Sequence, residues 1–405
     1  MSFTLLRQRN FALVWWAGLI SITGDWMLRI ALPVYVLQLT GSPLATSGAV
    51  MAGVLPSILF GLIAGVYVDR WDRRRTMLVV SVLQGLFLLP LLAGNVWAVY
   101  AVAFVQASLS LFFQPAEGSL LPQLVAAEDL TAANSLNSLN NNIGRLIGPV
   151  LGGFGLAGLG ITGVVIIDMA SFAVAAALLA AIAGDFRAKK LGESLGMRGE
   201  LAEGFRAIRR SRVTTAIMVI VLLMSVGEGV MASLFPVLVT GPLNAGAVGL
   251  GSLMAAQAVG GLLGGLVGTR FAAKINPITM VTAGLAVFGV LDVLIFNYPR
   301  WSTVLWPELV LFALVGIPAV LSQAALMTLL QTAHPGEVLG RIFSVALVLG
   351  ALATFAGASI AGTLALKAGV INVLTVQGTV QIFAALLFWL IARSGPARQL
   401  APEPS

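Results

Sequence analysis

The sequence contains no cysteine, and only 10% of its 405 residues are charged. The absence of cysteine excludes disulfides, thiolate metal sites and cysteine nucleophiles. The single histidine, His334, is followed by Pro335 and Gly336, a context typical of a loop. Apolar residues make up 59% of the chain, which excludes a soluble domain. The chain is therefore expected to be a membrane protein with many spans.

Twelve apolar segments are long enough to cross about 30 Å of hydrocarbon as helices. Six lie near residues 11–39, 45–68, 76–94, 97–122, 134–158 and 161–183, and six near 213–239, 246–270, 278–297, 303–330, 338–368 and 370–393. The first is longer than the apolar part of a signal peptide and lacks a small-residue cleavage site, so we expect it to remain as a helix. The sequence predicts an all-α membrane protein with both termini on one side.

Basic residues are distributed unequally between the two faces that these spans define. With the N-terminus inside, 19 basic residues fall in cytoplasmic loops and tails, and only Arg300 and Lys367 fall on the opposite face. This bias predicts cytoplasmic termini in a cell membrane and explains the net charge of +7 without a nucleic-acid partner. Because the chain has no G-x-x-x-x-G-K-[ST] motif and no catalytic constellation, we expect neither an enzyme nor a cofactor or metal site.

The densest charge cluster lies between the second and third spans. It consists of Gly65, Asp69, Arg70, Asp72, Arg73, Arg74 and Arg75. A charged side chain costs about 2.5–3.5 kcal/mol at a bilayer centre, so the cluster is expected in a loop at a membrane face, either as a plain solvated charge run or with a dedicated role.

The spacing G-x-x-x-D-R-x-x-R-R-R resembles the signature loop of major facilitator superfamily transporters. The family pattern usually has glycine where this chain has Asp72, and aspartate there is similar to the macrolide-efflux and enterobactin-exporter branch. The resemblance extends over nearly the whole chain. It implies a conformational gate that includes Gly65, Asp69, Arg70, Arg73 and Arg74.

Two landmarks repeat along the chain. Gly24-Asp25 is matched by Gly227-Glu228 at an offset of 203, and the Gly65 motif is echoed by Gly265, Thr269 and Arg270 at an offset of 200. Such a repeat predicts two six-helix halves, the major facilitator fold, with substrate bound between them. The predicted domains are 1–183, a cytoplasmic linker at 184–212, 213–393, and a tail at 394–405. In the linker, Leu201, Phe205 and Ile208 recur at helical spacing and predict an interfacial helix.

Acids inside the predicted spans are expensive and are therefore candidates for function. Asp25 lies near the middle of the first span, and Glu228 holds the matching place in the seventh. Both are expected to face a central cavity, where a carboxyl group can take up and release protons as its exposure alternates. The alternative for Asp25 is a structural pair with Arg29, one turn later. Trp26, beside Asp25, is the aromatic residue that we favour for contact with a bulky substrate.

Glu117 and Arg145 are expected to lie at similar depths, about 8–14 Å from the cytoplasmic ends of the fourth and fifth spans, and to pair across the gate. Asn134, Asn137 and Asn141 share a helix face with Arg145. That face either lines a wet cavity or provides hydrogen bonds between helices.

Three other acidic residues are weaker candidates for a role in transport. We expect structural roles for Asp168 in the sixth span and Asp292 in the ninth, and a solvated position for Glu308.

The fifth span contains the glycine-proline run Gly144, Gly148, Pro149, Gly152 and Gly153. Small residues at this spacing allow close packing of helices, and proline allows a kink. The run resembles a motif of drug/proton antiporters and thus implies export. The alternative is a packing motif that has no bearing on direction.

Together these features predict a monomeric secondary exporter in the cell membrane that exchanges protons for hydrophobic or cationic small molecules, such as macrolides. Two alternatives use the same fold: a dedicated siderophore or lysophospholipid exporter, and a membrane sensor that does not transport. The expected partners are the substrate, protons and the lipid bilayer.

Overall fold

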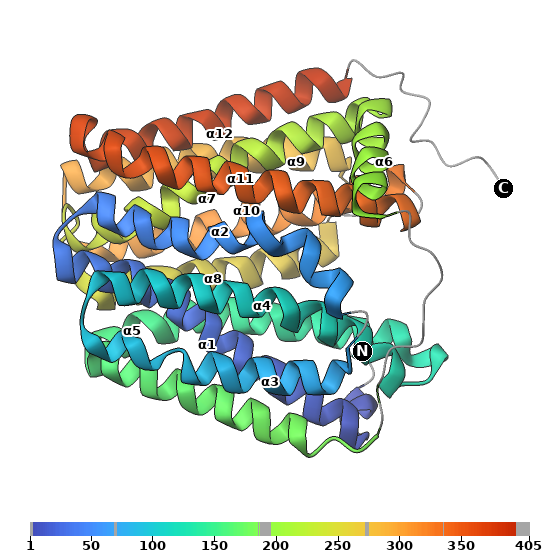
Figure 1. Ribbon diagram of the computed structural model, residues 1–405. Coiled ribbons are helices and arrows are strands. Elements are labelled where there is room, and N and C mark those ends of the chain that lie inside the picture. Colours follow the sequence, from blue (N-terminus) through green and yellow to red (C-terminus); the bar gives the residue numbers. More distant parts are fainter. Residues whose placement is uncertain are drawn as a thin grey trace. The chain divides into compact units, whose positions relative to one another are not determined.

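A computed structural model describes residues 3–68, 71–184, 186, 196–271, 275–334 and 336–393. Helices make up the regular structure of these residues (Figure 1). Within the same residues, 11 helices are long and apolar enough to cross a membrane. The predicted all-α membrane fold is confirmed.

The chain forms two compact units. The first comprises Met1–Ser194, Ala232–Ala255 and Ala358–Leu366. Its first 180 residues form η1 (Phe3–Arg7), α1 (Arg9–Thr40), α2 (Pro43–Val68), α3 (Arg73–Leu86), η2 (Leu89–Ala93), α4 (Val96–Leu124), η3 (Ala127–Asp129) and α5 (Leu130–Ala180). Asp72 is the N-cap of α3, where its side chain accepts a hydrogen bond from the backbone N–H of Arg75 at 2.8 Å. The acid at this position of the loop therefore fixes where α3 begins.

The second unit comprises Leu195–Met231, Ala256–Gly357 and Lys367–Ser405. From Gly196 onward, the described chain forms α6 (Gly196–Arg210), α7 (Arg212–Thr240), α8 (Gly246–Phe271), α9 (Pro277–Asn297), η5 (Tyr298–Arg300), α10 (Leu305–Ala333), α11 (Gly336–Ala368) and α12 (Val370–Arg393). Helices α7, α8 and α11 contribute residues to both units. The domain boundaries drawn from the sequence remain predictions, because the two units do not follow chain order.

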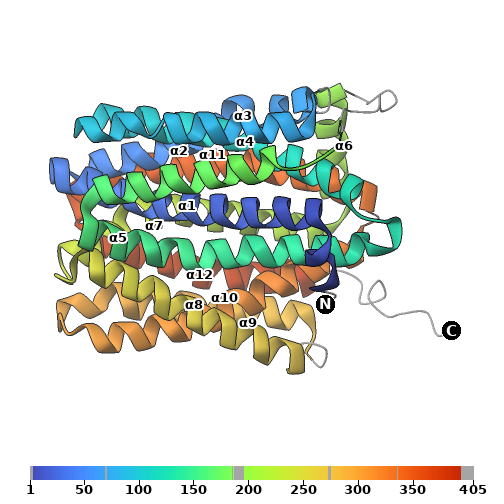
Figure 2. The ribbon, with the colours of Figure 1, turned by 90° about the horizontal axis from the view of Figure 1, so that it is seen from below.

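Helix α5 contains the fifth and sixth predicted spans, which are two helical limbs joined at a kink. The helix bends at Gly160, whose φ of 65° and ψ of −174° lie outside the helical region. A positive φ strains most side chains but not glycine. We call residues 130–159 the first limb of α5 and residues 161–180 the second limb. Helix α1 lies between these limbs (Figure 2).

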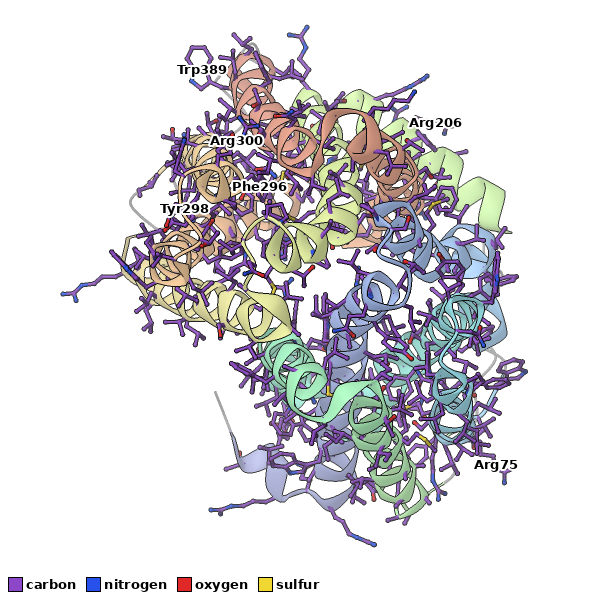
Figure 3. All side chains as sticks on the ribbon, turned by 90° about the vertical axis from the view of Figure 1, so that its left-hand side faces the viewer. Arg75, Arg206, Phe296, Tyr298, Arg300 and Trp389 are labelled. Carbon is purple, nitrogen blue, oxygen red and sulfur yellow. The ribbon has the colours of Figure 1, made fainter. Side chains whose placement is uncertain are left out.

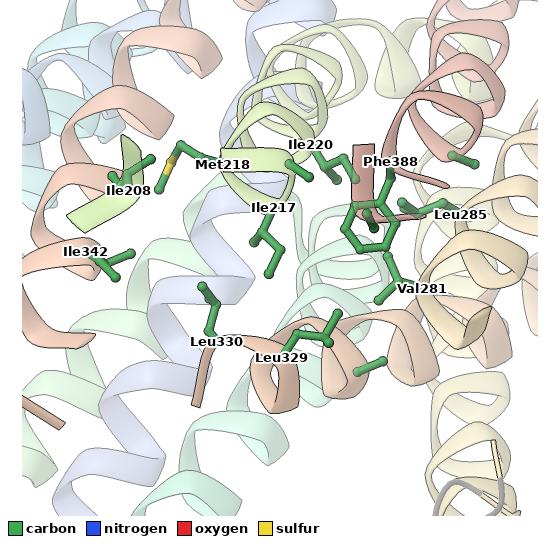
Figure 4. Close-up of a cluster of buried hydrophobic side chains, with 14 of the residues drawn as sticks. Ile208, Ile217, Met218, Ile220, Val281, Leu285, Leu329, Leu330, Ile342 and Phe388 are labelled. Atoms are coloured by element: carbon green, nitrogen blue, oxygen red, sulfur yellow. The ribbon is translucent and has the colours of Figure 1, made fainter. Parts of the chain in front are cut away.

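An apolar cluster joins six helices of the second unit (Figure 4). It includes Ile208 of α6, Ile217 of α7, Val281 of α9, Leu329 of α10, Ile342 of α11 and Phe388 of α12. The linker helix α6 is thus tied to the spans through Ile208, which is buried. In the first unit a similar cluster includes Val14 of α1, Met77 of α3, Phe113 of α4 and Leu179 of α5.

Candidate functional site

The glycine run of α5 brings the first limb into direct contact with α1. A Cβ on Gly144 would lie 2.4 Å from Cγ2 of Ile22, and one on Gly148 would lie 2.4 Å from Cβ of Trp26. Further along, a Cβ on Gly152 would lie 2.4 Å from the carbonyl oxygen of Met27. Real Cβ atoms do not approach this closely, so the glycines set the distance between the helices. The contact flanks Asp25 on both sides along α1.

The end of the glycine run meets another helix of the same unit. A Cβ on Gly153 would lie 2.4 Å from the Cα of Gly251 in α8. Pro149, inside α5, is buried. The run therefore packs along its whole length.

The second limb of α5 covers another side of α1. A Cβ on Gly24 would lie 2.0 Å from Oδ1 of Asp168. Asp168 is fully buried, and the hydroxyl of Ser171 donates a hydrogen bond to its Oδ1 at 3.1 Å. Its Oδ2 has no hydrogen-bond partner in the described part of the chain. Asp168 thus packs against Gly24, the residue that precedes Asp25 on α1.

A small polar cavity lies between α1, α4 and the first limb of α5. Gly18 and Asp25 line it from α1, Glu117 lines it from α4, and Asn140 lines it from α5. Its volume of about 30 Å³ matches one or two water molecules. A Cβ on Gly18 would lie 2.8 Å from Oε1 of Glu117, so this glycine makes room for the carboxyl group.

Two hydrogen bonds hold the wall of this cavity in place. The side chain of Asn140 donates to the carbonyl oxygen of Trp15 at 2.5 Å. The indole of Trp15 donates to the carbonyl oxygen of Leu136 at 2.9 Å. Gly18 and Asn140 were not among the site residues predicted from the sequence. Gly18, Ser21 and Asp25 follow helical spacing, a signal that could have identified this face.

Glu117 and Arg145 do not form the expected pair. Glu117 is buried beside Asp25, whereas Arg145 is exposed and donates to the side-chain oxygen of Asn142 at 3.4 Å. No ion pair joins the two residues in the described ranges. The physical reason is rotation about the helix axes: similar depth does not make two side chains face each other.

Arg29 packs against its neighbour on α1. Its guanidinium carbon lies 4.7 Å from the ring centroid of Trp26, within the range of a cation–π contact. The indole of Trp26 and the guanidinium of Arg29 thus form one continuous surface on α1, within about one turn of Asp25.

Glu228 lies on α7 in the second unit and is exposed. The preceding residue, Gly227, packs against α12: a Cβ there would lie 3.2 Å from Nε2 of Gln377. The buried carboxyl group of Asp292 lies near the side chains of Gln377 and Gln381. The glycine before each of the two central acids thus contacts a buried polar side chain, which is Asp168 for Gly24 and Gln377 for Gly227. A cavity shared by Asp25 and Glu228 remains a prediction, because they belong to different units.

The arginines at the start of α3 bind the end of α5. The guanidinium of Arg74 donates to the carbonyl oxygen of Leu179 at 2.9 Å and also to that of Ala180. Arg73 is buried and donates to the carbonyl oxygen of Phe186 at 3.5 Å. Cations at a helix C-terminus satisfy free carbonyls and complement the dipole. Asp69, Arg70 and the side-chain environment of Gly65 lie outside the described residues.

Glu308 and His334 lie near opposite ends of α10; Glu308 is buried and His334 is partly exposed. Glu308, expected to be solvated, is only 1% exposed, so that expectation is wrong. Glu308 lies in the first turn of α10, and packing around that turn buries its side chain. His334 follows the last turn, and its Nε2 lies 2.6 Å from the hydroxyl of Thr214 in α7. Burial lowers the pKa of His334.

Comparison with known protein families assigns this chain to one of them. The model of the Major Facilitator Superfamily matches residues 14–358. The chain belongs to this superfamily. Macrolide efflux protein A from Streptococcus pyogenes is 24% identical over 394 residues, which cover 93% of this chain and 95% of that protein. Multidrug efflux pump Tap from Mycolicibacterium fortuitum is 30% identical over 388 residues, covering 90% of this chain and 91% of the pump.

Solved structures show the same superfamily fold. The POT family transporter PepTSo superposes with a TM-score of 0.74 at 14% identity, covering 96% of this chain and 98% of PepTSo. A bacterial homologue of the iron transporter ferroportin, in an inward-facing state, gives 0.73 at 16% identity, covering 96% of this chain and all of the homologue. This superfamily member is therefore a multi-pass membrane transporter with relatives named for drug efflux.

Proposed function

We propose that this transporter exports hydrophobic or cationic small molecules in exchange for protons by alternating access. The observation that carries the proposal is the polar cavity in which Asp25 and Glu117 meet, inside a helix bundle of a membrane transporter. Carboxyl groups that share a cavity of this size can exchange a proton through water. The names of the macrolide and multidrug relatives support the substrate class.

Each residue has a defined part in this proposal. Asp25 and Glu117 bind the proton, and Glu228 binds one in the second half of the chain. The Trp26 and Arg29 surface contacts the substrate, where the indole suits apolar groups. Arg73 and Arg74 stabilise the end of α5 beside the gate loop.

One proton carries enough free energy for useful export. An inward proton supplies about 2.3 kcal/mol per 100 mV of membrane potential and about 1.4 kcal/mol per pH unit. Their sum of about 3.7 kcal/mol corresponds to a gradient of about 500-fold for a neutral substrate. Coupling requires that proton and substrate binding favour different states of the transporter.

The test is efflux from proteoliposomes with an imposed pH gradient. We expect Glu228→Gln to abolish uphill transport while downhill movement is partly retained, and Asp25→Asn also to weaken binding of cationic substrates. Glu128→Gln is the matched control, because Glu128 is an exposed acid in η3. Uphill transport by Glu228→Gln at the parental level would remove this residue from the proton pathway.

The substrate class needs a separate experiment. We expect a deletion strain to become more sensitive to macrolides and to cationic drugs, and the plasmid-borne gene to restore resistance. Unchanged drug sensitivity together with a loss of siderophore or lysophospholipid export would favour the dedicated exporters. Absence of counterflow for all of these substrates would favour a sensor.

A further inference from the structure

Helix α6 is fixed at the end of a membrane span. A single residue, Ser211, separates α6 from α7. The hydroxyl of Thr215 in α7 donates to the carbonyl oxygen of Ile208 in α6 at 2.8 Å, and the backbone N–H of Ser211 donates to the same oxygen at 3.3 Å. Figure 1 shows the light green α6 running across the direction of α7. Because α7 is long and apolar enough to cross a membrane, α6 lies where this span leaves the hydrocarbon.

The inner face of α6 packs on α11. A Cβ on Gly204 would lie 2.6 Å from the carbonyl oxygen of Arg341, so the two helices are in backbone contact. The carboxylate of Glu203 forms an ion pair with the guanidinium of Arg341. Ile208 enters the apolar cluster of the second unit. These contacts fix which side of α6 faces outward.

The outer face of α6 is basic and has one large apolar side chain. It consists of Ala202, Phe205, Arg206, Arg209 and Arg210, which are all exposed and form one open, shallow surface. Figure 3 labels Arg206 at the outside of the light green helix. Glu203 pairs with Arg341, and among the described residues no acid is paired with Arg206, Arg209 or Arg210. Phe205 is 44% exposed, an uncommon position for an aromatic ring in water.

We propose that this outer face of α6 binds anionic phospholipid headgroups at the membrane surface. A guanidinium can donate two parallel hydrogen bonds to a phosphate, which makes arginine well suited to lipid phosphate. Phenylalanine between arginines is typical of a helix that lies in the interface and buries its ring among acyl chains. The position of α6 at the end of α7 brings both groups to the depth at which headgroups lie.

The positive charge of the outer face of α6 favours an anionic lipid headgroup as its ligand. Each arginine near an anionic membrane surface strengthens binding by about fivefold, so three arginines together contribute about 100-fold. A neutral headgroup such as phosphatidylcholine has its own cation and does not provide this complementarity. A water-soluble phosphate offers no acyl chain to Phe205.

The experiment uses the full-length protein in detergent, titrated with phosphatidylglycerol and followed by native mass spectrometry. Phosphatidylcholine of the same chain length is the neutral comparison, and glycerol phosphate is the soluble anion. We expect tighter binding of phosphatidylglycerol than of either. The triple variant Arg206→Gln, Arg209→Gln, Arg210→Gln should weaken phosphatidylglycerol binding at least about tenfold. The corresponding triple lysine variant should retain most of it.

A matched control removes the same charge elsewhere. Arg7, Arg9 and Arg75 are exposed and lie in the first unit, and their triple glutamine variant should bind phosphatidylglycerol as the parent does. Equal weakening by both triple variants would show a general charge effect and overturn the site. Binding of glycerol phosphate as tight as that of phosphatidylglycerol would also overturn it, in favour of a soluble anion. Thermal unfolding of each variant verifies that the protein is folded.

Discussion

Gly24 and Asp168 are in such close contact that a methyl group on the glycine would lie 2.0 Å from Oδ1 of the acid. The same methyl group would lie 2.7 Å from the hydroxyl of Ser171, which hydrogen-bonds to that oxygen. The acid is therefore part of the surface against which α1 packs. Because Asp25 follows Gly24 in the chain, this contact determines the position of a proposed proton-binding residue.

The first prediction concerns this contact. We expect Gly24→Ala to lower the free energy of unfolding by about 1–3 kcal/mol because the helices must separate. Adding Asp168→Ala creates space for the new methyl group, so the double variant should be more stable than the sum of the single effects by at least about 0.5 kcal/mol. Thermal unfolding in detergent measures all three variants.

A second pair of variants serves as the control for this cycle. Among the described residues, a Cβ on Gly118 in α4 would meet no atom within 4 Å outside its own stretch of helix, so Gly118→Ala and Asp168→Ala should be additive. If Gly24→Ala and Asp168→Ala were also additive, the contact would not control stability.

The second prediction concerns the two acids of the small cavity. Because Asp25 and Glu117 share water-sized space, we expect Asp25→Asn and Glu117→Gln to be strongly non-additive in proton-driven efflux. Glu117→Gln and Arg145→Gln should be additive, since Arg145 lies on an exposed face and bonds to Asn142. The reverse pattern would restore the pairing of Glu117 with Arg145 across the gate.

The third prediction concerns the arginine that caps α5. Arg74→Ala removes charged donors from the carbonyls of Leu179 and Ala180 and should lower the free energy of unfolding by about 1.5–3 kcal/mol. The neighbouring Arg75 is exposed, so Arg75→Ala should change it by no more than about 0.5 kcal/mol. Equal effects of the two substitutions, measured by thermal unfolding, would contradict the cap.

The fourth prediction is a pH dependence that depends on His334. Burial lowers the pKa of this histidine in the folded protein, so folding favours the neutral ring. The unfolded chain binds the proton more readily, and stability therefore falls as the pH decreases below about 6.5, the ordinary pKa of histidine. We expect the parent to lose more stability than His334→Gln between about pH 7.5 and about pH 5.5. Parallel stability curves would show that His334 does not contribute.

The sequence predicted the spans and the close-packed glycines because both follow from spacing along one helix. It did not predict the neighbours of Glu117 or the burial of Glu308. Depth in the membrane can be counted at about 1.5 Å per residue, but the direction of a side chain around the helix depends on the neighbouring helices. Gly18 illustrates the limit: only the structure shows that its missing side chain makes room for an acid from α4.

The sharp bend at Gly160 means that one non-helical residue joins the two limbs of α5. A long loop could absorb an inserted residue, but a helical limb cannot do so without turning the residues that follow. One extra residue within the second limb, between Gly160 and Asp168, would rotate Asp168 by about 100° about the axis of that limb. The rotation would carry Asp168 away from Gly24 while the first limb kept its glycine contacts with α1. The chain length between Gly160 and Asp168 thus determines which side chain of the second limb meets Gly24 of α1.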